Sequence, residues 1–236
     1  MWELLQYTDS AFPTGAFTHS YGMESLVQEK AIHDLNSAEK WLVRCLAKGW
    51  APTDGLAILL AWHAVNEADA LSIRNEQLFE NLAEIDMTLT ASRPAKEAND
   101  ASVSTGKRLL KEAVQIQDSP ILSGYYEWIK GQKLFNFLGN FSVVYGIIGA
   151  SSGWPSEQTG LASAYATSAG LVAALIKLVP LGQSEGQLLL SRLSKPLFDA
   201  ITEQKKKTLR ELGASLPLWD IAQMRHESLY SRLFRS

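Results

Sequence analysis

The sequence predicts an all-α fold, a single-domain bundle of about eight to ten helices over residues 1–236. Apolar residues recur at three-, four- and seven-residue spacings through most of the chain, the period of a helix with one buried face. Prolines and capping residues mark repeated helix starts. Alternating runs typical of strands are absent. The best strand candidate, FSVVYGII at residues 141–148, has a glycine spacing that suits close helix packing equally well.

The chain begins with a predicted turn followed by a helix. The stretch FPTG, residues 12–15, combines a proline, a capping threonine and a permissive glycine, which is typical of a tight turn before a helix start. Residues 16–27 then form a helix that buries Phe17, Tyr21 and Leu26.

Further helices follow at regular intervals. Asn36 with Glu39 three residues later matches a capping box and predicts a helix over 38–50. Pro-Thr-Asp at 52–54 breaks this helix, and a new one covers 55–68. The later predicted helices are 70–93, one that opens at Ser119-Pro120, two uncharged helices within 134–156 and 157–179, 188–206, and 218–234.

Composition and charge favour a cytoplasmic protein that does not bind nucleic acid. The formal net charge is −3, whereas binding DNA or RNA usually needs a basic excess. Cys45 is the only cysteine, so internal disulfides and zinc sites built from paired cysteines are excluded. The first ten residues lack the basic and apolar regions of a secretory signal.

Two uncharged runs raise the alternative of a transmembrane hairpin. Residues 134–156 and 158–176 carry no charge and are joined by a short turn. Both runs are rich in glycine, serine and asparagine or threonine, which makes them too polar for strong membrane insertion. Helices that are uncharged on all sides are usually buried in a core or an oligomer interface, and we expect that here, without a membrane span.

The residues offer little evidence for catalysis. Asp9, His19 and Ser20 resemble an acid, base and nucleophile set, but neighbouring side chains on one helix point about 100° apart. None of the four histidines forms a metal-binding pair at i, i+4, and Gly106-Lys107 lacks the preceding glycine of a phosphate loop. The competing hypothesis is an all-helical metalloenzyme or small-molecule enzyme that uses His19 or His63.

The C-terminal segment, residues 217–236, is dense in apolar, aromatic and arginine side chains. Chain ends usually fray, so such a segment needs a surface on which to dock. One reading is that it packs onto its own domain. The other is that it binds a partner, because aromatic residues and arginine are enriched in interface hot spots.

Four segments of the chain resemble the UreF family, the urease accessory proteins F. LLQYTDSAFPTGAFTHSYGMES resembles the N-terminal signature of that family, and DIAQMRHESLYSRLFRS resembles its C-terminal signature. LVPLGQSEGQ and SRPAKEANDASVSTGKRLL resemble internal segments. The resemblance spans essentially the whole chain. Two positions differ from the family pattern: Asn140 stands where a histidine is frequent, and Lys177 where an arginine is frequent.

The resemblance implies a non-catalytic chaperone that is needed for nickel insertion into apo-urease. It implies an all-helical homodimer that binds UreD, also called UreH, and with it recruits the GTPase UreG. Nickel and GTP would be handled by these partners, so the chain alone would bind no cofactor. Asn140 removes one candidate metal ligand, and we expect no metal site.

The resemblance also assigns site residues. The expected UreD-binding residues are Arg225, His226, Tyr230, Arg232, Leu233 and Phe234. The expected residues of a UreG-binding or dimer groove are Phe17, His19, Tyr21 and Tyr165. Gln183 and Gln187 lie beside apolar helices, and either line a polar passage for a hydrated metal ion or simply face solvent.

Overall fold

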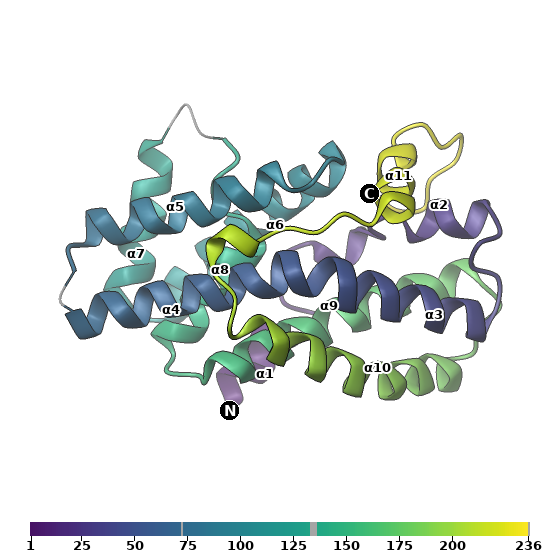
Figure 1. Ribbon diagram of the computed structural model, residues 1–236, viewed down its shortest axis with the longest axis horizontal. Helices are drawn as coiled ribbons and strands as arrows, with labels where there is room; N and C mark the ends of the chain where they lie inside the picture. Colours follow the sequence, from purple (N-terminus) through teal and green to yellow (C-terminus); the bar gives the residue numbers. More distant parts are fainter. Residues whose placement is uncertain (72, 133–135, 236) are drawn as a thin grey trace.

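A long helical rod runs through the middle of the molecule (Figure 1). Three consecutive elements form it without interruption: α3 (Leu35–Cys45), the π-helical η2 (Leu46–Gly55) and α4 (Leu56–Leu71). The computed structural model describes residues 1–71, 73–132 and 136–235, without the side chain of Phe17.

Other helices surround this central rod, and the predicted all-α class is confirmed. The described ranges hold eleven α-helices and no strand. Because η2 joins α3 to α4 in one rod, the α-helices form ten separate units. The remaining bounds are α1 (Trp2–Thr8), η1 (Ala16–Thr18), α2 (Met23–Gln28), α5 (Asn75–Ala91), α6 (Lys96–Ile116), α7 (Pro120–Gly131), α8 (Phe141–Ser151), α9 (Ser156–Leu178), α10 (Gln183–Gln204), η3 (Leu209–Glu211) and α11 (Pro217–His226).

The predicted helix break at residues 52–54 is wrong, because the chain stays helical through Pro52. A proline has no N–H to donate, and its ring clashes with the preceding turn of an α-helix. The wider π-helical turn of η2 accommodates that proline. The Thr53 hydroxyl donates a hydrogen bond to the Gly49 carbonyl oxygen at 2.8 Å, so a side chain of η2 also bonds to the backbone of η2.

The capping box at the start of α3 lies two residues earlier than predicted. Asp34 accepts a hydrogen bond from the Ser37 N–H at 2.8 Å, and the Ser37 hydroxyl accepts one from the Asp34 N–H at 3.0 Å. Glu39, which was expected to close the box, forms an ion pair with Arg192 on α10. Asp34 and Ser37 are both strong capping residues, so the first suitable pair defines the helix start.

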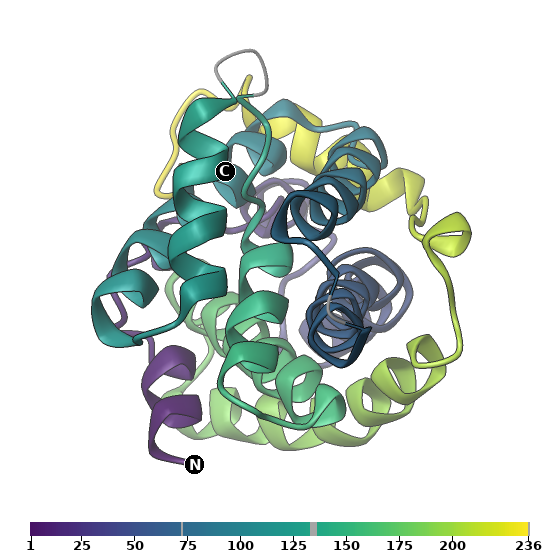
Figure 2. The same ribbon diagram turned by 90° about the vertical axis from the view of Figure 1, so that its left-hand side faces the viewer.

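Two buried apolar clusters share the central rod. One joins α4 to α5, α6, α7 and α8, and the other joins α3 and η2 to α2, α9 and α10. Figure 2 shows the rod nearly end-on with the other helices around it. The segment 141–148, once the best strand candidate, is helix α8, and Gly146 lets it approach the backbone of α4 at Ile58.

Close backbone packing also involves Gly106 on α6. A Cβ at this position would overlap the Gly139 carbonyl oxygen and the Phe141 amide nitrogen. We expect Gly106→Ala to lower the free energy of unfolding by about 2 kcal/mol, because packed backbone cannot move aside. Gly170→Ala is the control, since no described atom lies within 4 Å of its added Cβ. It should raise stability by up to about 1 kcal/mol. Equal effects in urea denaturation would contradict the close approach.

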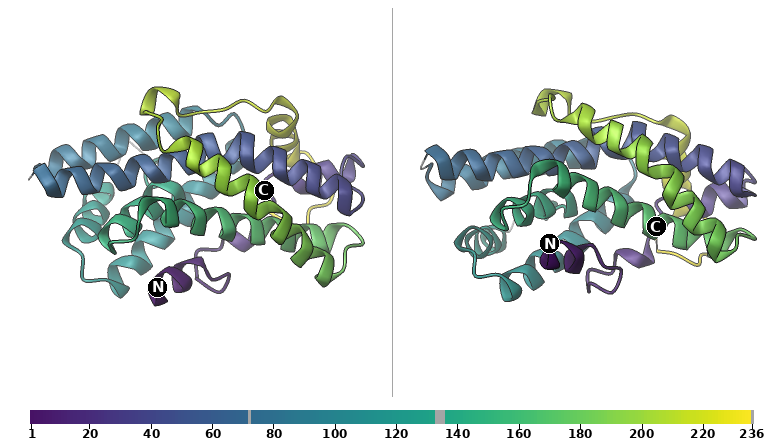
Figure 3. Two further views of the ribbon diagram at one scale, coloured as in Figure 1. Left: turned by 60° about the horizontal axis from the view of Figure 1, so that its bottom comes forward. Right: turned by 90° about the horizontal axis from the view of Figure 1, so that it is seen from below.

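The first uncharged run contains α8, the second lies within α9, and within the described ranges only α9 is long and apolar enough to cross a membrane. Helix α8 has 11 residues, too few for the other arm of a hairpin, which needs roughly 20. Helix α9 packs against α10, α4 and α8, and α1 lies beside it (Figure 3). These contacts favour the expected role of α9 as a helix of the bundle.

The N-terminal segment 16–27 does not form the single helix that was predicted. It divides into η1 and α2, because Tyr21 and Gly22 have φ angles of 48° and 81°, which a continuing helix cannot adopt. Leu26 is buried as expected, whereas Tyr21 is only partly buried. The prediction for the Phe17 side chain lies outside the part of the chain that is described.

Three further helix boundaries differ from the predictions. Helix α10, expected over 188–206, begins at Gln183. The helix expected over 70–93 is interrupted, since α4 ends at Leu71 and α5 begins at Asn75. The helix expected over 218–234 ends at His226, and the following residues run as turns. The predicted helix starts at Pro120, Ser156 and Pro217 are confirmed.

Candidate functional site

The C-terminal tail, residues 227–235, is held against the bundle by two carboxylates. His226, at the end of α11, lies between Glu97 on α6 (Nδ1 to Oε2, 2.7 Å) and Glu24 on α2 (Nε2 to Oε2, 3.2 Å). Arg232 donates to the other oxygen of Glu97 at 2.7 Å. We call Glu24, Glu97, His226 and Arg232 the tail clamp. Figure 1 shows α11 and the tail beside α2.

The clamp also explains why the tail is not helical. Glu24 accepts backbone hydrogen bonds from Leu233 at 2.7 Å and Phe234 at 3.1 Å. These two N–H groups therefore bond to a side chain instead of a preceding turn. The Glu24 and His226 side chains are only 5% and 1% exposed, and buried polar groups need such hydrogen-bond partners.

The six expected UreD-binding residues fall into two groups, one buried and one exposed. His226 and Phe234 are buried and fasten the tail to its own domain. Tyr230 and Leu233 are exposed, whereas exposed Arg225 and Arg232 form ion pairs with Glu29 and Glu97. Sequence reasoning missed Glu24 and Glu97, because their partners lie about 130 to 210 residues away.

Helix α11 presents a second exposed feature beside the tail. Its outward row consists of Leu218, Ile221 and Met224, which are 63%, 38% and 43% exposed. On the opposite side, the Trp219 indole N–H donates to the Tyr21 carbonyl at 2.7 Å and anchors the helix to the N-terminal segment. The outward row therefore lies on a fixed helix rather than on a frayed end.

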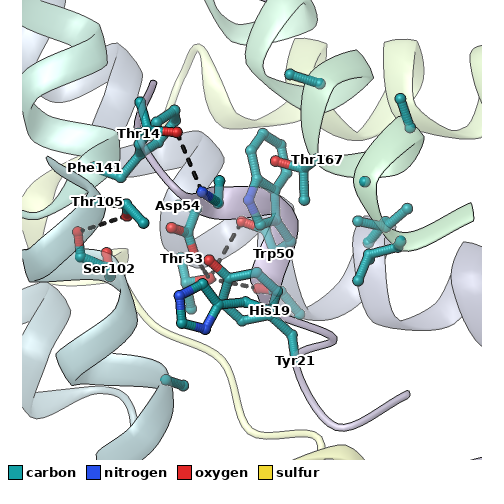
Figure 4. Close-up of a pocket in the computed structure, with 18 of the residues that line it drawn as sticks. Thr14, His19, Tyr21, Trp50, Thr53, Asp54, Ser102, Thr105, Phe141 and Thr167 are labelled. Atoms are coloured by element: carbon teal, nitrogen blue, oxygen red, sulfur yellow. Dashed lines mark hydrogen bonds between the residues drawn. The ribbon is translucent and has the colours of Figure 1, made fainter. Parts of the chain in front are cut away.

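A pocket of about 570 Å³ opens between the two apolar clusters. It is lined by residues of α1, η1, η2, α6, α8, α9 and α11 and of the loops between them, among them 9–14, 19–21, 92–95 and 214–216. Its volume falls in the range of ligand sites, and its walls mix aromatic and polar side chains. Figure 4 shows His19 and Tyr21 at the pocket, close to Trp50, Thr53 and Asp54.

Three of the four residues expected in a groove line this pocket: His19, Tyr21 and Tyr165. Tyr165 on α9 is 57% exposed at the rim, so it is available for contact with another molecule. The His19 and Tyr21 rings lie 5.9 Å apart. Burial raises the pKa of Tyr21 to about 12, and the charge of Asp54 adds to this increase.

A buried polar network supports one wall of the pocket. Asp54 pairs with Arg93 and accepts a hydrogen bond from Ser142, and Arg93 also donates to Asn140 at 2.9 Å. Asn140 in turn donates to Asp86, which is fully buried. Burial raises the pKa of the Asp86 carboxyl, while its hydrogen bonds act in the opposite direction.

The two positions that differ from the family pattern both have structural contacts. Asn140 is fully buried, and its amide donates to Asp86 at 2.8 Å and to Thr90 at 3.0 Å. The Lys177 ammonium lies 5.8 Å from the centre of the Phe234 ring, a distance typical of a cation–π contact. Each residue therefore stabilises the fold around it.

The expected passage residues lie elsewhere. Gln183 and Gln187 are exposed on α10 and do not line the pocket. Within the described part of the chain, no three His, Cys, Asp or Glu side chains gather as a metal site would require.

The members of the possible catalytic set serve local structure. Asp9 accepts a hydrogen bond from the Ala11 N–H at 2.7 Å, and buried Ser20 accepts one from the Glu24 N–H at 3.5 Å. His19 lies in the extended backbone after η1 and contacts the Tyr21 ring. These contacts agree with the structural reading of the opening stretch.

The fold and these regions define an all-helical protein with an anchored tail and an open pocket. The chain belongs to the UreF family, whose family model, described as UreF, matches residues 32–194.

Similarity to individual relatives extends over nearly the whole chain. The chain is 34% identical over 235 residues to the urease accessory protein UreF of Bacillus sp. (strain TB-90), covering 99% of this chain and 97% of that protein. It is 32% identical over 233 residues to the protein of the same name from Actinobacillus pleuropneumoniae serotype 5b (strain L20), with the same coverage. The corresponding Haemophilus influenzae (strain PittEE) protein is 30% identical, with 99% and 94% covered.

Proposed function

We propose that this chain is a urease accessory protein that acts in urease maturation as a non-catalytic scaffold. The observation that carries this proposal is the similarity to proteins named urease accessory protein UreF along 99% of the chain. In the finer form of the proposal, the chain is a cytoplasmic homodimer that binds UreD and UreG. Their assembly inserts nickel into apo-urease, and the partners handle the nickel and the GTP.

The tail and α11 are the proposed UreD-binding surface. Exposed Tyr230 and Leu233 would make direct contact, and Arg225 and Arg232 would contribute from the same surface. His226 and Phe234 would act by holding the tail in place, because both are buried. The outward row Leu218, Ile221 and Met224 extends this surface along α11.

Capture of UreD by the purified chain tests this assignment. We expect the double variant Tyr230→Ala, Leu233→Ala to bind UreD about tenfold more weakly or worse, because both side chains are exposed and hot spots contribute most of an interface energy. Leu188→Ala, a 42% exposed leucine on α10, is the control and should bind normally. Unchanged capture by the double variant would remove the tail from the UreD surface.

The pocket rim is the proposed groove for UreG or for the second copy in the dimer. Tyr165→Ala should leave thermal stability unchanged, since the ring is 57% exposed, and should weaken dimerisation or UreG capture. Phe198→Ala, a 46% exposed aromatic on α10, provides the control. A Tyr165→Ala protein that remains dimeric in sedimentation and captures UreG normally would eliminate both roles.

The passage role of Gln183 and Gln187 stays a prediction. Both side chains are exposed, so replacing both with leucine should not disturb the fold. Loss of urease activation in this variant would support a polar path along α10. Full activation would show that the two side chains only face solvent.

A further inference from the structure

Two exposed arginines, Arg108 and Arg235, flank the loop at residues 14–19. The Arg108 guanidinium on α6 donates to the Thr14 carbonyl at 3.3 Å. The Arg235 N–H donates to the Thr18 carbonyl at 2.8 Å, which places the end of the tail against the same loop. Among the residues that the structure describes, neither guanidinium has a carboxylate within ion-pair distance.

The neighbouring arginines of α11 and of the tail do have carboxylate partners. Arg225 is paired with Glu29, and Arg232 is paired with Glu97. Their charges are therefore partly neutralised within the chain. Arg108 and Arg235 leave positive charge available on a chain whose formal net charge is −3.

The fields of these two arginines overlap at His19. Burial lowers the pKa of His19, the charges of Arg235 and Arg108 lower it further, and the charge of Glu97 raises it. Lys177 adds another exposed cation nearby, since its ammonium lies 5.8 Å from the centre of the Phe234 ring. The loop at 14–19 is thus bordered by positive charge from α6 and from the tail.

We propose that Arg108 and Arg235 form a docking surface for carboxylate side chains of a partner protein. Within the proposed function, on which this inference rests, the partner is the GTPase UreG. The planar guanidinium groups suit bidentate binding of carboxylates, and two unneutralised charges accelerate encounter with an acidic surface. A protein fits better than a free anion, because the loop at 14–19 lines the same pocket as Tyr165, the 57% exposed rim residue in the proposed UreG groove.

Association kinetics of UreG with the complex of this chain and UreD test the proposal. We expect Arg108→Glu with Arg235→Glu to lower the association rate about tenfold at low ionic strength. Added salt should slow association of the wild type until the difference between the two rates disappears. Arg210→Glu reverses an exposed arginine elsewhere on the chain and should associate as wild type does. Arg108→Lys with Arg235→Lys should keep the fast association and dissociate faster, because lysine lacks the bidentate fork.

Arg235→Gln alone is the control for a folding defect, because no described interaction of the fold depends on the Arg235 guanidinium. This variant should show a smaller loss of association rate than the double glutamate variant. If wild type binds UreG and all these variants bind it equally well, the inference is wrong while the proposed complex stands. If wild type does not bind UreG at all, the proposed complex fails and the inference fails with it.

Discussion

Asp86→Ala is expected to lower the free energy of unfolding by about 4 kcal/mol. The carboxylate accepts hydrogen bonds from the Gly139 N–H (2.7 Å), the Asn140 N–H (2.8 Å) and the Tyr125 hydroxyl (3.0 Å). Alanine would leave these buried donors without an acceptor, at a cost of about 1–3 kcal/mol each. Relief of the buried charge offsets part of the loss.

The loss should be visible in urea denaturation followed by circular dichroism. Asp69→Ala, an exposed aspartate near the end of α4, is the control and should change stability by less than about 0.5 kcal/mol. Because a domain is stable by only about 5–15 kcal/mol, Asp86→Ala should also reduce soluble yield. If the two variants unfold at the same urea concentration, the buried network does not stabilise the wall of the pocket.

His226→Ala is expected to lower the free energy of unfolding by about 3 kcal/mol and to release the tail. Glu24 and Glu97 would each lose a hydrogen-bond partner, and removing one partner of a buried pair is strongly destabilising. Trypsin should then cut after Arg232 much faster than in wild type, because the tail no longer docks.

His33→Ala is the control that tests whether the loss of stability is specific to the tail clamp. His33 has a side chain that is 64% exposed, so its loss should change stability by less than about 0.5 kcal/mol. A His226→Ala protein with wild-type stability and wild-type resistance to trypsin would contradict the clamp. Loss of UreD capture in His226→Ala alone would not separate folding from contact, so the exposed Tyr230 and Leu233 variants are needed as well.

Sequence periodicity predicted the fold class because most helices carry an apolar stripe that a local window can detect. It failed where distant contacts decide the local structure. Pro52 lies in a π-helical turn that is held between two apolar clusters, so the usual rule for proline did not apply. The tail has helical composition, yet Glu24, more than 200 residues away, takes two of its N–H groups.

The candidate site could likewise be predicted only in part from the sequence. The resemblance pointed to His226, Arg232 and Phe234, and the structure brings these residues to one place. Glu24 and Glu97 lie in segments that resemble the family, but neither was assigned a role, because charged residues that bond over such distances leave no periodic signal in a sequence. The pocket gathers residues from seven helical elements and several loops, and no short motif encodes such a set.

The most direct test of the proposed role is urease activity from the source organism's own urease operon, expressed with nickel, with and without the gene for this chain. The proposed function predicts that activity collapses on deletion, that urease subunit levels remain constant, and that the intact gene restores activity. Unchanged urease activity in the deletion strain would contradict the proposed role in urease maturation.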